Sequence, residues 1–244
     1  MVQLQPSTPL TVIYPESDGQ PMADNTKQFR WIVTIKENLE LLFVDRGDVF
    51  VAGDLLWYPV QGNNTLCQAP DAMAVFGRPK GDRGSYKQWE EAGIAPQVVF
   101  EILSPSNRLG EMAKKFQFYQ DYGVEEYYVY NPDTIDLSGW QRLDGILSVI
   151  EDIAGWTSPR LQIRFELTPN SLQIYRPDGE RFLTYVELAA LREVDRQRAE
   201  QEKQRAEQEK QRADEAILQL EAERERNQAL IERLRQLGIN PEPE

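Results

Sequence analysis

One stretch of the chain restricts the fold more than any other, because two apolar segments enclose a helical one. Residues 97–104 (QVVFEILS) suit a buried strand, residues 108–122 place apolar side chains at helical spacing, and residues 126–131 (EYYVYN) predict a second strand. A strand, a helix and a strand joined by short connections form a parallel crossover unit. The sequence therefore predicts an α/β fold.

The segments on either side extend this unit into a larger sheet. Residues 24–43 predict a helix with one apolar face, and residues 48–60 and 69–77 predict strands that precede the crossover. Antiparallel strands up to about residue 179 are suggested by GWQRL, LSVIED, RLQIRFEL and LQIYRPDG. We expect a mixed central sheet flanked by helices. A long loop at 77–96 interrupts it, and loops of this length are often functional.

Composition excludes several kinds of site. The chain has no histidine and a single cysteine, Cys67. This rules out an intramolecular disulfide, a zinc site of the usual cysteine and histidine kind, and the Ser-His-Asp and Cys-His mechanisms. Any catalysis must use carboxylates, lysine, tyrosine, serine or a hard metal ion. The formal net charge of −13 argues against a protein that coats nucleic acid non-specifically, because such binding draws on clustered lysines and arginines.

The length of 244 residues allows one globular core with an extension. No apolar run approaches the roughly 20 residues of a membrane helix, and the first residues lack the basic and apolar regions of a signal peptide. We therefore expect a cytoplasmic protein that does not bind membranes. The expected parts are an irregular lead-in at 1–23, a globular domain at 24–187, a charged helix at 188–238 and a tail at 239–244.

A charged repeat begins near residue 188. QRAEQEK occurs twice in succession, at 197–203 and 204–210, and QRADEAI at 211–217 is a third, altered copy. One interpretation is a solvated helix held by ion pairs between residues four apart, because a seam of alanines buries little. The other is a coiled-coil seam near the end of the helix. We expect a homodimer, formed through this helix or through the body.

Two carboxylates stand at unusual positions. Asp71 follows Pro70 at the start of a predicted strand, and Glu101 interrupts an apolar strand. A buried ionised carboxylate needs an ion pair, a cage of hydrogen bonds or a metal ion. If both acids lie on one face of neighbouring strands, a divalent cation such as Mg²⁺ converts their repulsion into attraction. The alternative is two unrelated acids, each in its own salt bridge.

The helix after Glu101 carries a lysine that suits such a site. Its predicted buried face consists of Leu109, Met112, Phe116 and Tyr119. Lys115 flanks this face, whereas Lys114 points to the far, solvent side. A lysine at this place can orient an attacking water or stabilise charge on a phosphoryl group. The alternative is a surface lysine whose aliphatic stem covers apolar side chains.

Together these motifs resemble a known family. They comprise PD at 70–71, VVFEILSPSN at 98–107 and KFQFYQDYGVEEYYVYNP at 115–132, and the resemblance extends over about residues 20–180. The sequence resembles the restriction-endonuclease-like family that is abundant in cyanobacteria and long described as being of unknown function. That family is similar in its core to the PD-(D/E)XK nuclease superfamily. The resemblance implies hydrolysis of DNA phosphodiesters that depends on Mg²⁺ or Mn²⁺.

The resemblance also assigns roles to individual residues. It implies that Asp71 and Glu101 hold the metal, with the backbone carbonyl of Ile102 as a further ligand. It implies that Lys115 positions the attacking water, which the metal makes more acidic. The standard E-x-K motif would have its lysine at Leu103, and the family displaces that lysine into the following helix. The histidine common near the N-terminus of many relatives is missing.

Further candidates lie outside these motifs. Asp54 is a possible third acid at the metal, although a carboxylate in a bulge or turn is the simpler interpretation. Four basic residues of the 77–96 loop are candidates for contacts with DNA phosphates, and a solvated loop is the alternative: Arg78, Lys80, Arg83 and Lys87. The competing function is a non-catalytic one, in which a nuclease fold serves as a scaffold and the C-terminal helix recruits a partner.

Overall fold

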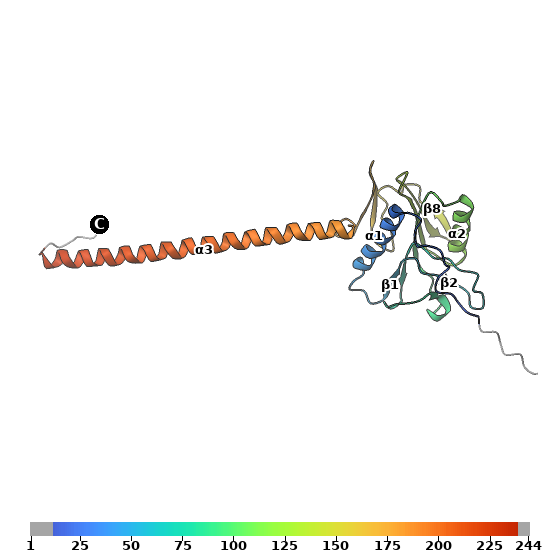
Figure 1. The fold of residues 1–244 in the computed structure, drawn as a ribbon, viewed down its shortest axis with the longest axis horizontal. Helices are drawn as coiled ribbons and strands as arrows, with labels where there is room; N and C mark the ends of the chain where they lie inside the picture. The colour runs from blue at the N-terminus through green and yellow to red at the C-terminus, as the bar shows by residue number, and fades with distance from the viewer. Residues whose placement is uncertain (1–11, 239–244) are drawn as a thin grey trace, which may run out of the picture. The chain divides into compact units, whose positions relative to one another are not determined.

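A computed structural model describes residues 12–238. Residues 1–11 and 239–244, which include the whole expected tail and part of the lead-in, lie outside the described residues. The chain forms two compact units, Met1–Tyr185 and Val186–Glu244. In Figure 1 the first unit is a sheet with helices packed on it, and the second is a single long helix.

A six-stranded sheet forms the centre of the first unit. Its strands, in spatial order, are β1 (Val49–Ala52), β3 (Ala72–Phe76), β5 (Val98–Ile102), β6 (Glu126–Asn131), β7 (Asp136–Leu143) and β8 (Ile146–Val149). Strands β5 and β6 pair in parallel, and every other neighbouring pair is antiparallel. The predicted mixed central sheet is confirmed, and its parallel step is the predicted crossover.

The remaining elements surround this sheet. They are the helices α1 (Thr26–Leu42), α2 (Leu109–Asp121) and α3 (Tyr185–Gln236), the short 3₁₀ helix η1 (Gln88–Glu90), and the strands β2 (Trp57–Tyr58), β4 (Tyr86–Lys87), β9 (Arg164–Leu167) and β10 (Leu172–Tyr175). The 77–96 segment is therefore not a plain loop, since it contains β4, which pairs in parallel with β2, and η1. No helix in the described part of the chain combines the length and apolar character that a membrane span requires.

Two helices cover opposite faces of the central sheet (Figure 1). Helix α1 packs Ile32 and Leu39 into the core that contains Phe100 and Ile102 of β5. Helix α2 packs into a second core, on the other side. Because alternate residues of a strand point to opposite faces, Glu101, between Phe100 and Ile102, faces α2.

The buried face of α2 differs from the prediction at the start of the helix. Leu109, predicted to be buried, is 88% exposed, whereas Phe118 and Tyr119 are buried. Leu109 is the first residue of the helix, where the chain has only just left the loop after β5. The helix is therefore rotated so that Lys115, four residues before Tyr119, faces the sheet.

We predict that Glu126 stabilises the fold through a cage of donors. Its buried carboxylate accepts hydrogen bonds from Tyr128 Oη at 2.9 Å, Arg160 N at 2.7 Å and Ser158 Oγ. Glu126→Ala leaves these donors unpaired and is expected to lower the free energy of unfolding by about 3 kcal/mol, measured by urea denaturation. Glu125→Ala is the matched control, since it removes only a half-exposed ion pair with Arg160 and should cost under about 1 kcal/mol. Equal losses of unfolding free energy in the two variants would contradict the stabilising role of Glu126.

Candidate active site

The two predicted acids stand beside each other at the end of neighbouring strands. In the register of β3 and β5, Ala72 is opposite Phe100. Asp71 precedes Ala72 and Glu101 follows Phe100, so the next step of the antiparallel register brings the two acids together. Asp71 is 8% exposed and Glu101 is 3% exposed. The structure thus places two buried carboxylates at one point of the sheet.

Both oxygens of Glu101 have partners on α2. Lys115 Nζ donates to Oε2 at 2.6 Å, and Tyr119 Oη donates to Oε1 at 2.5 Å. Lys115 and Tyr119 are four residues apart, so one face of the helix presents both donors. As predicted, the side chain of Lys115 reaches Glu101. It does not extend to the surface as the alternative interpretation required.

The carboxyl group of Asp71 is held by β5. Its Oδ2 accepts a hydrogen bond from Ile102 N at 2.6 Å. Burial, followed by the charge of Glu101, raises the pKa of Asp71 well above its usual value, although Lys115 and the hydrogen bond from Ile102 act in the opposite direction. The protein therefore holds Asp71 in a place where a negative charge is unfavourable unless further positive charge is present.

Lys115 supplies the positive charge nearest to the acids. Burial is the largest single effect on its ammonium and acts to lower its pKa, but Glu101 and Asp71 outweigh it, and the pKa of Lys115 is raised. Lys115 is therefore protonated at neutral pH. A protonated lysine can donate hydrogen bonds and balance charge, but it cannot accept a proton.

The Ile102 carbonyl, predicted as a metal ligand, already has a partner. Gln28 Nε2 on α1 donates to Ile102 O at 2.8 Å, and Gln28 Oε1 accepts from Asp24 N at 2.8 Å. A carbonyl oxygen has a second lone pair, so this contact orients Ile102 O without occupying it fully. Gln28 thus fixes the end of β5 from the side of α1.

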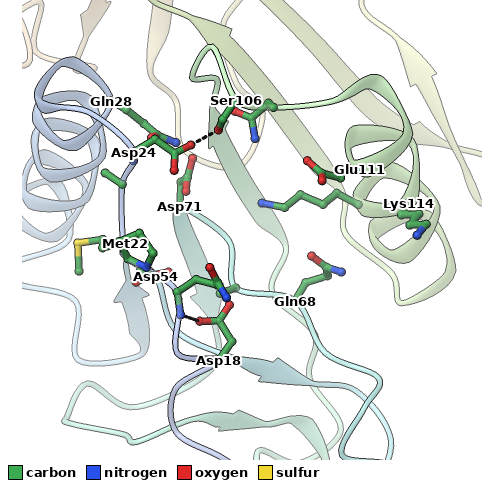
Figure 2. A pocket seen from close by; sticks show the side chains of 16 residues that line it. Asp18, Met22, Asp24, Gln28, Asp54, Gln68, Asp71, Ser106, Glu111 and Lys114 are labelled. Atoms are coloured by element: carbon green, nitrogen blue, oxygen red, sulfur yellow. Dashed lines mark hydrogen bonds between the residues drawn. The ribbon is translucent and has the colours of Figure 1, made fainter.

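A cavity of about 430 Å³ opens beside Asp71 (Figure 2). Its charged lining residues are Asp18, Asp24, Asp54, Asp71, Glu111, Lys114 and Lys115. Acids outnumber lysines in this lining, so an anionic phosphate would enter against a net negative charge. A cation bound near Asp71 would reverse that balance. Lys114 is exposed, as predicted, although it also contributes to the lining of the cavity.

Asp54 lies at the cavity in a strained turn rather than in a strand bulge. Its φ of 49° is in the left-handed region, and Asp54 N donates to Pro70 O at 3.0 Å. The preceding Gly53 is needed because a Cβ there would lie 3.2 Å from Asp71 O. Burial, then the charge of Asp18, raises the pKa of Asp54. Within residues 12–238 no three His, Cys, Asp or Glu side chains lie close enough together to hold a metal, so Asp54 does not complete a three-acid set.

A family model and a solved structure are similar to this chain. A family model named Uma2 and described as "Putative restriction endonuclease" matches residues 17–170. The chain belongs to this family. The matched residues include Asp71, Glu101 and Lys115, and the predicted resemblance is confirmed. Among solved structures, a protein from Anabaena variabilis described as "a putative nuclease belonging to DUF820" is 14% identical, with a TM-score of 0.43 over 57% of this chain and 75% of that chain. No curated protein matches.

The basic residues of the 77–96 segment have contacts of their own in this Uma2 protein. Arg78 Nε and Arg83 Nε each lie 2.7 Å from a carboxylate oxygen of Glu91, and Arg83 also covers the ring of Phe50 at 3.9 Å. These two arginines therefore hold the segment together. Lys80 Nζ donates to Val44 O at 3.3 Å, and Lys87 Nζ lies 3.6 Å from a carboxylate oxygen of Glu90. Contacts with DNA phosphates stay a prediction for all four basic residues.

The segment before α1 belongs to the same unit and forms one wall of the cavity. The ring of Tyr14 packs on Tyr58 at 5.2 Å and on Trp89 at 4.9 Å, and Tyr58 Oη donates to Pro15 O at 2.8 Å. Residues 18 and 20–24 then line the cavity. The expected irregular lead-in is irregular over its described part, but it helps to form the site.

Three polar residues of the site were not predicted from the sequence. Gln28 is a polar residue on the apolar face of α1, and the sequence alone could have indicated that it has a role. Tyr119 follows Lys115 by four residues, but its ring suggested a core residue. Asp24 accepts hydrogen bonds from Ser104 Oγ at 2.6 Å and from Ser106 Oγ, while Asn25 caps α1. The pairing of Asp24 with a loop 80 residues away has no local signature.

We predict that Asp71 makes this Uma2 protein less stable at neutral pH. A carboxyl whose pKa is raised by folding binds its proton more tightly in the folded state, so stability falls as pH rises from about 3.8 through the raised pKa. Asp71→Asn keeps an acceptor for Ile102 N and removes the charge. In buffer with a chelator, we expect its free energy of unfolding at pH 7 to exceed that of the wild type by at least about 1 kcal/mol.

The control for this prediction is the same comparison below the usual pKa of the carboxyl. There Asp71 is protonated in both states, so the two proteins should have equal stability in urea denaturation. A difference that does not change between pH 3 and pH 7 would contradict the assigned cause.

Proposed function

We propose that this protein is an endonuclease that hydrolyses DNA phosphodiester bonds and depends on Mg²⁺ or Mn²⁺. The observation that carries the proposal is the convergence of Asp71, Glu101 and Lys115 at the end of β5, beside a cavity. The family description supports a nuclease, and DNA and a divalent metal are the specific part of the proposal.

The donors present fit a hard divalent cation. Mg²⁺ is bound by one or two carboxylates and completes its coordination with water and substrate phosphate oxygens, so Asp71 and Glu101 suffice without a third acid. Each carboxylate oxygen of Glu101 keeps a lone pair beyond its single hydrogen bond. The repulsion that raises the pKa of Asp71 is of the kind that a bound cation relieves. When bound, the cation would supply positive charge that polarises the phosphate and acidifies an attacking water.

The residues of the chain have separate roles in this proposal. Asp71 and Glu101 would hold the cation, and Gln28 fixes the Ile102 carbonyl beside them through a hydrogen bond. Tyr119 fixes one oxygen of Glu101 and so sets the direction of the other. Lys115, which stays protonated, donates hydrogen bonds to the attacking water or to the phosphoryl oxygens and stabilises the charge that develops there.

One observation favours a second candidate function, that of a non-catalytic scaffold. Lys115 and Tyr119 already satisfy both oxygens of Glu101 with protein partners, as in a purely structural buried ion pair. A scaffold of this kind needs neither cation nor hydrolysis. The two functions therefore differ in whether the acids bind a metal at all.

We predict that the wild type cuts supercoiled plasmid DNA in Mg²⁺ or Mn²⁺ and not in a chelator. Asp71→Ala, Glu101→Gln and Lys115→Met should each lower the rate at least about 100-fold, because each removes a charge that the transition state needs. Lys27→Met is the matched control, since Lys27 is an exposed lysine that does not line the cavity, and it should change the rate little. Cleavage that survives in Glu101→Gln would rule out the proposed site.

We also predict metal binding that is measurable without DNA. Titration of the wild type with Mn²⁺, followed by electron paramagnetic resonance, should show a site that Asp71→Ala weakens by at least about tenfold. Asp54→Ala should bind as the wild type does, because Asp54 does not group with the two acids. Binding that Asp71→Ala leaves unchanged would favour the scaffold function.

A further inference from the structure

Helix α3 has nothing covering it within its own unit. It runs for 52 residues, from Tyr185 to Gln236, and none of its described side chains is buried. Helices in proteins gain most of their stability by packing an apolar face against other elements. A helix of this length with exposed aliphatic residues therefore has a face available to a partner.

A continuous seven-residue register defines that face. The repeat places Ala199, Ala206 and Ala213 at one heptad position, d. Continuing in steps of seven, d is occupied by Leu220, Asn227 and Leu234, and position a between them by Ile217, Arg224 and Ile231. Isoleucine at a with leucine at d is the combination that favours two-stranded parallel coiled coils, and a polar residue in the seam fixes the register.

The exposure of these residues agrees with a seam that is uncovered in one chain. Ile217 is 55% exposed, Leu220 is 49% exposed and Ile231 is 38% exposed. Leu230, at the flanking g position, is 59% exposed. From residue 217 to residue 231 these side chains form one apolar line along about four turns of the helix. A second helix can cover such a line.

The charged half of α3 alternates basic residues at position a with acidic residues at the flanking positions. Position a is basic there, with Arg196, Lys203 and Lys210, and the flanking e and g positions are acidic, with Glu200, Glu202, Glu207 and Glu209. In a parallel pair, a side chain at a lies beside the g side chain of the other helix. Lys203 would therefore meet the partner's Glu202, and the same contact would recur in the next heptad.

We propose that α3 pairs with α3 of a second copy of this chain as a parallel, in-register coiled coil, with its apolar seam between residues 217 and 237. Parallel pairing matches every layer with itself, alanine with alanine and leucine with leucine, and each basic residue at a, although it faces its own copy, lies beside an acidic g residue of the other helix. An antiparallel pair could match only the apolar end with itself and would leave the charged repeats without a partner. The proposal is independent of nuclease activity.

The first experiment measures the mass of the full chain in solution by light scattering over a range of concentrations. The expected mass is twice the 28.2 kDa of one chain. The double variant Ile217→Lys with Ile231→Lys should lower it to that of one chain, because it puts charge into the seam. The matched control is Leu218→Lys with Val194→Lys, at exposed positions b and f outside the seam, and it should remain dimeric.

Circular dichroism accompanies these measurements, because lysine is a good helix former and both double variants should keep α3 helical as dimers or monomers. A wild type with the mass of one chain would overturn the proposal. A seam variant that stays dimeric would also overturn it, because the dimer would then form through the N-terminal unit. A control variant that dissociates as much as the seam variant would overturn it as well.

The second experiment tests the orientation with cysteines. In a Cys67→Ser background, Leu220→Cys places thiols in facing d positions of a parallel pair, and oxidation should give a disulfide-linked dimer. An antiparallel pair of the apolar ends would be centred near residue 227. Linkage through Asn227→Cys but not through Leu220→Cys would therefore overturn the parallel arrangement.

Discussion

The negative charge of Glu101 inside a buried strand is the constraint on which the surrounding elements depend. The carboxylate is 3% exposed, and Lys115 and Tyr119 bind its two oxygens from one face of α2. Removing one partner of a buried ion pair typically costs about 3–5 kcal/mol, because the other charge is left uncompensated. Helix α2 is therefore held over β5 in one rotation, and this rotation brings Lys115 to the cavity.

The end of β5 is fixed from the other side by contacts between segments far apart in the sequence. Ile102 donates its N–H to Asp71 and its carbonyl accepts from Gln28. Ser104, two residues later, donates to Asp24. A strand end, the start of α1 and the segment before it thus meet at the cavity. Such a network positions groups more firmly than a loop alone, and firm positioning is what a catalytic site needs.

The central sheet and the two acids could be predicted because their signals are local. β-branched runs mark strands, and a carboxylate in an apolar run stands out, as Glu101 does. The approach of Lys115 followed from helical periodicity, but the rotation of α2 did not, since packing against the sheet decides it. The hydrogen bond from Tyr119 to Glu101 was not predicted, because the apolar ring of Tyr119 indicates a core residue and does not reveal what its hydroxyl group binds. The anchoring of Tyr14 had no periodic signal, because aromatic residues distant in sequence create it.

The proposed pairing through α3 would affect how an acidic protein could act on the proposed DNA substrate. A net charge of −13 opposes binding to phosphates. Because residues 1–185 precede the helix in both copies, parallel pairing joins both N-terminal units to the same end of the coiled coil. Once one unit engages a duplex, the other is present at high effective concentration. In the proposed dimer, two linked units would therefore bind the proposed DNA substrate more tightly than two separate units.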